Sequence, residues 1–142
     1  MNDALIANIN STVKEDDTLW ILGDVSLNPA AVKHNVPRIN CKNLLLLGGN
    51  HDRIFSMKEK WINLYKEWGF TEIYKEPVVR WFNGKQFTMS HHPIFPSKGI
   101  TLCGHVHTSW KLKEKNLNVG VDQWDYFPVS LDEILELINE SN

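Results

Sequence analysis

The chain has 142 residues, 42% of them hydrophobic and 23% charged, with a formal net charge of -2 at pH 7. This length suits one domain with a core, and the weak net charge argues against a surface for duplex nucleic acid or an acidic membrane. Because no apolar run is long enough to cross a bilayer and the two cysteines form no spaced motif, we expect one cytoplasmic domain over residues 1–142, with no membrane partner.

Helical and strand patterns alternate along the first half of the chain. Apolar residues spaced three to four apart predict a helix over 3–14, and an apolar run predicts a strand over 18–22. Asn28-Pro29 combines a helix cap with a first-turn proline, so a short helix should follow. Four leucines at 44–47, ended by glycines, predict a strand buried on both faces. Next, Ser56 is expected to cap a helix that ends at Gly69, with its aromatic stripe in the core.

The second half of the chain predicts short strands and one final helix. Strands over 78–82 and 85–90 flank Asn83-Gly84, which is a strong signal for a two-residue hairpin. Further short strands are expected over 101–103 and 117–121. Ser130 and Glu133 form a capping box that opens the last helix. The predicted class is therefore α/β, with helices on the outside.

Side chains suited to metal binding and acid–base chemistry follow four of the predicted strands. They are Asp24; Asn50, His51 and Asp52; His91 and His92; and His105 and His107. Each group alone is weak, because a Gly-Asp pair is usually a turn and an isolated histidine is usually just hydrogen-bonded. Since α/β folds collect their sites at the carboxyl ends of strands, we expect the groups to meet there. Carboxylate, amide and imidazole ligands together suit divalent Mn, Fe, Ni or Zn.

The order of these motifs resembles the calcineurin-like metallophosphoesterase superfamily. The matching segments are Gly23-Asp24, Gly49-Asn50-His51-Asp52, His91, Gly104-His105-Val106-His107 and the tail over 118–131, which is similar to compact bacterial and phage members. The resemblance implies an α/β/β/α sandwich and hydrolysis of a small phosphoester or nucleotide-type substrate, as a monoester or a diester.

The resemblance also implies a role for each site residue. Asp24 would bridge two metal ions, and His107 would belong to the first of them. The second ion would be held by Asp24 with Asn50, His91 and His105. His51 would be the acid or the phosphate contact, oriented by Asp52.

Physical chemistry supports such a ligand set for phosphate esters. Because a phosphate anion repels a nucleophile, bound cations clamp its oxygens and acidify a water molecule into the attacking hydroxide. The carboxylate of Asp24 offers one oxygen to each of two ions, and His51 can protonate the leaving oxygen. The histidine ligands must be neutral to bind a metal.

One expected motif is absent from this sequence. The family opens with Asp-x-His on its first strand, and no aspartate here has a histidine two residues later. We therefore expect the sandwich to lack its first strand, with one firmly held ion, most suitably Mn²⁺, and a weak second site. A start assigned too late, a one-metal remnant, and a gap covered by a second copy of the chain all remain open.

The sequence therefore favours a metallophosphoesterase, and two other functions stay open. The runner-up is a catalytically weak or inactive metal-binding subunit, motivated by the absent Asp-x-His. A nucleic-acid-binding module is a distant third, because the lysines at 58, 60 and 66 suit a solvated helix face. Arg53 and His34 are interpreted as surface residues. His92 either lines the substrate cleft or contacts a metal-binding residue without binding the metal itself.

Overall fold

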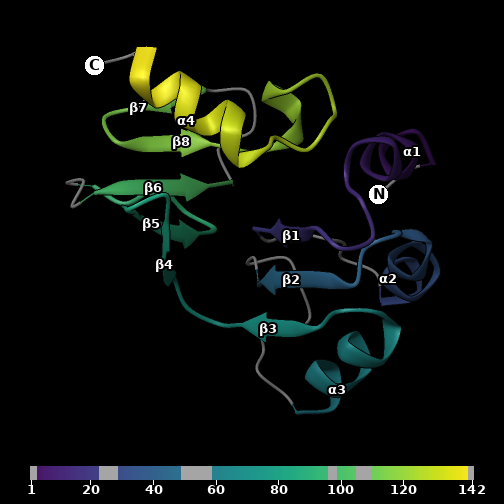
Figure 1. Cartoon of the computed structure of the whole chain (residues 1–142). Helices are drawn as coiled ribbons and strands as arrows, with labels where there is room; N and C mark the ends of the chain where they lie inside the picture. Colours follow the sequence, from purple (N-terminus) through teal and green to yellow (C-terminus); the bar gives the residue numbers. More distant parts are fainter. Residues whose placement is uncertain (1–2, 23–28, 49–58, 96–98, 105–109, 141–142) are drawn as a thin grey trace.

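The computed structural model describes residues 3–22, 29–48, 59–95, 99–104 and 110–140 (Figure 1). These residues form a mixed α/β structure with two β-sheets and four α-helices. The helices are α1 (Asp3–Thr12), α2 (Pro29–Asn35), α3 (Glu59–Trp68) and α4 (Leu131–Glu140). The predicted α/β class is confirmed at this level.

The first sheet is parallel, with the strand order β1-β2-β3. Its strands are β1 (Thr18–Ile21), β2 (Asn43–Leu47) and β3 (Glu72–Tyr74). The leucine run forms the central strand, as predicted, and its side chains alternate between two cores. Leu44 and Leu46 pack against α1, α2 and α3, whereas Leu47 packs toward the second sheet.

A first core lies between this sheet and the three N-terminal helices (Figure 1). Its buried members are Ile9, Val32, Val36, Ile39, Leu44, Leu46, Tyr65 and Phe70. The apolar stripe predicted for the first helix is confirmed, since Ile9 is buried there and Leu5 and Val13 pack at its edge. The aromatic stripe of α3 likewise packs in this core through Tyr65.

The second sheet has the strand order β4-β5-β6-β8-β7. Its strands are β4 (Val78–Phe82), β5 (Lys85–Ser90), β6 (Ile100–Cys103), β7 (Leu112–Lys113) and β8 (Asn116–Asn118). The predicted hairpin is confirmed: Asn83 and Gly84 both have positive φ, 51° and 75°, as a type I′ turn requires. Strands β5, β6 and β8 are parallel, so their carboxyl ends lie at one edge.

A second core joins the two sheets and α4. Its buried members are Leu22, Leu47, Val78, Phe87, Met89, Leu102, Leu117, Ile134 and Ile138. At its edge, Arg80 of β4 lies over the stacked rings of Trp20 and Tyr74 from the first sheet. The capping box predicted for the last helix is present, since the Ser130 hydroxyl accepts a hydrogen bond from the Glu133 N–H at 3.2 Å. The two sheets are therefore packed together by one shared set of apolar side chains.

Three details differ from the prediction. Strands β3 and β7 were not predicted, because two or three residues carry no readable alternation. The strand expected over 117–121 is instead Asn116–Asn118, and Val121 begins a 3-10 helix, Val121–Gln123. The chain leaves the sheet early because the Asn118 side chain accepts a hydrogen bond from the Gly120 N–H at 2.9 Å and turns the backbone.

The two sheets point their carboxyl ends toward one another. Figure 1 shows the arrowheads of β1 and β2 directed toward those of β5 and β6. Within the described residues β1 is an edge strand of its sheet. No helix in the described segments is long and apolar enough to cross a membrane.

Candidate metal centre at the strand ends

Three segments that are far apart in the sequence meet beyond β1, β5 and β6. His91 follows β5, and its Nδ1 lies 2.8 Å from the carbonyl oxygen of Leu22, the residue after β1. Gly104 follows β6, and its N–H donates to the His91 carbonyl at 3.1 Å. Leu22 is 69 positions from His91 in the chain. The meeting point therefore exists only in the folded protein.

The hydrogen bond to the Leu22 carbonyl makes Nδ1 of the His91 ring a donor. A carbonyl oxygen only accepts hydrogen bonds, so the Nδ1 of a neutral imidazole must carry the proton and donate it. The Nε2 then keeps its lone pair, which is the form that binds a metal ion. Metal-binding histidines usually donate their second nitrogen to a carbonyl or carboxylate in this way. His91 is only 5% exposed, so the orientation of its ring is held by its surroundings.

Gly104 allows the close approach of these segments. A Cβ atom at this position would lie 3.1 Å from the Leu22 carbonyl oxygen and 3.9 Å from His91 Nδ1. Since 3.1 Å is tighter than ordinary carbon–oxygen contact, any larger residue must push against the acceptor that orients His91. Glycine is required here because the neighbouring segments leave no room for a Cβ atom, and not because the backbone has a positive φ.

His92 lies beside His91 but faces a different environment. The two rings meet edge to face with centroids 4.6 Å apart. His92 is exposed, whereas His91 is buried. His92 therefore contacts the candidate ligand from outside.

Six of the seven predicted site residues lie outside the described residues. They are Asp24, Asn50, His51, Asp52, His105 and His107. Arg53, Asn28 and Ser56 lie outside them as well. In the segments that the structure covers, no group of three or more His, Cys, Asp or Glu side chains is arranged to hold a metal ion. Of the predicted site, the structure therefore describes His91 itself and, for the other motifs, the residues that precede or follow them.

Those flanks are brought to neighbouring positions. Leu22 and Leu47 come one or two residues before the Gly23-Asp24 and Gly49-Asn50 motifs, and both pack in the second core with Leu102 of β6. Leu102 in turn precedes Gly104-His105 by two residues. The chain segments that lead into three of the motifs thus share one core, and the meeting of the motif residues themselves stays a prediction.

Cys103, at the end of β6, is not a ready metal ligand or nucleophile. Its side chain is fully buried, and burial raises the pKa of its thiol from 9.0 to about 12. The thiolate is the form that binds metals and attacks electrophiles, so Cys103 stays protonated and inert at neutral pH.

Two buried asparagines near the site were missed in the sequence. Asn116 and Asn118 on β8 are both 0% exposed and hydrogen-bond to the chain beyond β5 and β6. The available signal was the alternation Asn-Leu-Asn, with Leu117 in the core and two amides on the opposite face.

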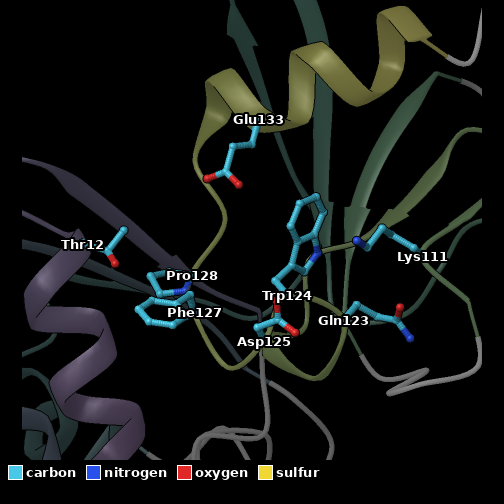
Figure 2. Close-up of a pocket in the computed structure, with 8 residues that line it drawn as sticks. All are labelled: Thr12, Lys111, Gln123, Trp124, Asp125, Phe127, Pro128 and Glu133. Atoms are coloured by element: carbon cyan, nitrogen blue, oxygen red, sulfur yellow. The ribbon is translucent and has the colours of Figure 1, made fainter.

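A separate open pocket lies between α1, the loop before α4 and the start of β7 (Figure 2). Its volume is about 390 Å³. Figure 2 shows Lys111 on one side of the Trp124 ring and Phe127 with Pro128 on the other, and the Lys111 Nζ is 4.1 Å from the ring centroid. The Trp124 N–H donates to the Asn118 carbonyl at 2.9 Å, which fixes the ring.

Comparison with known proteins gives relatives without an assigned function. No protein-family model matches the chain. It is 29% identical to the uncharacterized protein MJ1445 of Methanocaldococcus jannaschii over 153 residues, covering 99% of this chain and 76% of that protein. It is 26% identical to the Gene 66 protein of Mycobacterium phage L5 over 174 residues, covering 97% of this chain and 81% of that protein.

A solved structure shares the fold. The crystal structure of the protein of unknown function AQ665 from Aquifex aeolicus matches with a TM-score of 0.71 and 22% sequence identity. The match covers 94% of this chain and 83% of the other. The likeness therefore extends across both sheets, and it concerns the fold alone.

Proposed function

We propose that this protein is a divalent-metal-dependent phosphoesterase similar to the calcineurin-like superfamily, with an α/β/β/α sandwich fold. The observation that carries the proposal is the buried ring of His91. Its Nδ1 donates to the carbonyl of Leu22, which directly precedes the Gly23-Asp24 motif, and in the neutral ring Nε2 has a lone pair for a metal ion. A histidine of one predicted motif is thus tied to the start of another.

The donor set of this chain fits a borderline divalent ion. His91 supplies a neutral imidazole, and the sequence motifs supply the carboxylate of Asp24, the amide oxygen of Asn50 and the imidazoles of His105 and His107. Such a mixed set suits Mn²⁺ and also Fe, Ni or Zn. When bound, the metal supplies charge neutralisation at the phosphate and lowers the pKa of water.

The remaining chemistry belongs to the side chains. We propose that His51 protonates the leaving oxygen or contacts the phosphate, and that Asp52 holds its ring in the productive orientation. Asn50 offers a neutral oxygen and so adds no negative charge near an anionic substrate. The substrate class that fits is a small phosphomonoester or phosphodiester, including nucleotides.

The test is hydrolysis of p-nitrophenyl phosphate and of its bis-ester by the purified chain with Mn²⁺. Substitution of His51 by Ala should lower turnover by roughly 10²-fold or more, the usual worth of a positioned acid. Asn50→Ala and His91→Ala should also lower the affinity for Mn²⁺. His34→Ala is the matched control, because His34 lies exposed near the end of α2 and should leave both measurements unchanged.

Turnover that is unaffected by His51→Ala and His91→Ala would contradict the proposal. One tightly held ion per chain with no hydrolysis under Mn, Fe, Ni or Zn would favour the alternative, a metal-binding subunit without turnover. Metal analysis and the hydrolysis assay on one preparation separate the two functions.

A further inference from the structure

One face of the second sheet is lined by buried polar side chains, here called the polar face. Its members are Ser90, Thr101, Cys103, Asn116 and Asn118, which the strand register places side by side. All five are no more than 5% exposed, and the two asparagines are 0% exposed. Because burying an amide without partners costs free energy, the contacts of Asn116 and Asn118 show what these residues do.

The side chain of Asn116 hydrogen-bonds to both backbone polar groups of Ile94, which lies in the segment that follows β5. Its Oδ1 accepts the Ile94 N–H at 2.8 Å, and its Nδ2 donates to the Ile94 carbonyl at 2.9 Å. The amide therefore pairs with Ile94 as a neighbouring strand would. Ile94 comes three residues after His91, whose ring is bonded to Leu22. The segment carrying His91 is thus held at both ends.

Asn118 hydrogen-bonds the chain that follows β6. Its Nδ2 donates to the Trp110 carbonyl at 3.0 Å, and its backbone N–H donates to the Lys111 carbonyl at 2.7 Å. Trp110 is where the described chain resumes after residues 105–109, the stretch that contains His105 and His107. On the other side of that stretch, the Gly104 N–H donates to the His91 carbonyl at 3.1 Å.

We propose that Asn116 and Asn118 are positioning residues for the metal centre. Two amides spaced two apart on β8 hold Ile94, three residues after His91, and Trp110, three residues after His107. The inference rests on the proposed metal site and adds residues that do not touch the metal. Only an amide has a donor and an acceptor side by side, so neither a carboxylate nor an apolar residue can replace it.

The expected effect is on metal affinity. Partners that orient the ligands of a metal typically contribute 10- to 100-fold to its binding. In Asn116→Asp, one oxygen still accepts from the Ile94 N–H, but the other faces the Ile94 carbonyl and repels it. We therefore expect the Kd for Mn²⁺ to rise by about tenfold or more. Asn118→Asp should do the same, because its carboxylate has no N–H for the Trp110 carbonyl.

The matched control is Thr101→Val. Thr101 is the register partner of Asn116 on the polar face and is 3% exposed. The substitution keeps the shape and removes a buried polar group from the same sheet. It should change the Kd for Mn²⁺ by less than about twofold, whatever it does to the unfolding midpoint. The full chain is titrated with Mn²⁺ by calorimetry, and thermal unfolding is recorded in EDTA.

Equal losses of Mn²⁺ affinity in the asparagine variants and in Thr101→Val, at similar losses of stability, would overturn the inference. Wild-type affinity in both Asn116→Asp and Asn118→Asp would also overturn it. If one of the two Asp variants does not fold, the other decides.

The same experiments distinguish failure of the phosphoesterase proposal from failure of the positioning role. A wild-type chain that binds Mn²⁺ without hydrolysing either ester ends the phosphoesterase proposal and leaves the affinity comparison valid. A wild-type chain that hydrolyses the esters while its asparagine variants bind Mn²⁺ normally ends the positioning role alone. A wild-type chain that binds no divalent ion contradicts both.

Discussion

At the scale of single residues, Gly104 occupies the point where three segments of the chain meet. A methyl group added there would press on the Leu22 carbonyl at 3.1 Å. Because that carbonyl orients the His91 ring, we predict that Gly104→Ala weakens Mn²⁺ binding and lowers stability by about 1–3 kcal/mol, the usual cost of overpacking. Calorimetric titration and thermal unfolding measure the two effects.

The control for this substitution is Gly84→Ala in the hairpin. Gly84 has φ of 75° and open space around its Cα, so alanine introduces backbone strain only. It should lower stability by about 1 kcal/mol and leave Mn²⁺ affinity unchanged. A Gly104→Ala chain that binds Mn²⁺ as tightly as Gly84→Ala would show that the contact with Leu22 has no influence on the metal centre.

Cys103 supplies a prediction that follows from its pKa. Burial raises the pKa of its thiol to about 12 from 9.0, so in the folded chain it stays protonated at pH 8. We predict that an aromatic disulfide reagent reacts quickly with Cys41, which is only partly buried, and slowly with Cys103. Mass spectrometry of the labelled peptides distinguishes the two. Labelling of Cys103 as fast as Cys41 would contradict its burial.

The same shift makes stability depend on pH. Between about 9 and about 12 the unfolded chain loses the Cys103 proton while the folded chain keeps it. Because the folded state then binds more protons, the free energy of unfolding falls as pH rises through this interval. In Cys103→Ala this part of the alkaline decline should disappear, and urea unfolding at pH 8 and pH 10.5 measures the difference.

At the scale of secondary structure, the last helix shows a local rule acting as expected. Ser130 and Glu133 satisfy each other, with the Ser130 N–H donating to Glu133 Oε1 at 3.3 Å and the Glu133 N–H donating to Ser130 Oγ at 3.2 Å. We predict that Ser130→Ala lowers the free energy of unfolding by about 1 kcal/mol. Ser11→Ala is the control, since that exposed hydroxyl donates only within its own helix and should cost less than about 0.5 kcal/mol.

The elements that the sequence predicted well are those whose signals are local. The hairpin needs only Asn83-Gly84, and the helix ends need only Gly69 or the capping box. Strands β3 and β7 escaped because each exists only by pairing with a neighbour: Glu72 pairs with Leu45, and Leu112 with Leu117. A strand of two or three residues is defined by its pairing with a neighbouring strand, which its own sequence does not indicate.

At the scale of the whole molecule, the two cores join different elements. The first core packs α1, α2 and α3 against the first sheet, and the second core joins both sheets and includes Leu22 and Leu47, which precede two motifs of the candidate metal centre. We predict that Leu46→Ala lowers the free energy of unfolding by about 2–5 kcal/mol without changing Mn²⁺ affinity in the folded chain.

Met89→Ala should have both effects. Met89 is 1% exposed in the second core and lies on β5, two residues before His91. A cavity there loosens the strand that leads into His91, the candidate ligand, so the Kd for Mn²⁺ should rise along with the loss of stability. Mn²⁺ titration below the unfolding range of each variant checks the difference, and equal affinities in the two variants would separate the second core from the site.

The sequence by itself determined the α/β class, the position of most helices and strands, and the set of side chains suited to a metal. These follow from periodicity, caps and turn residues that lie within a few positions of each other. Only the tertiary structure decided that His91 Nδ1 donates to a backbone carbonyl, why residue 104 is glycine, and that Asn116 holds Ile94. Each of those facts depends on a contact with a residue 13 to 82 positions away, such as the carbonyl of Leu22. Every residue has the same backbone groups, so the sequence does not reveal which distant backbone atom a side chain contacts.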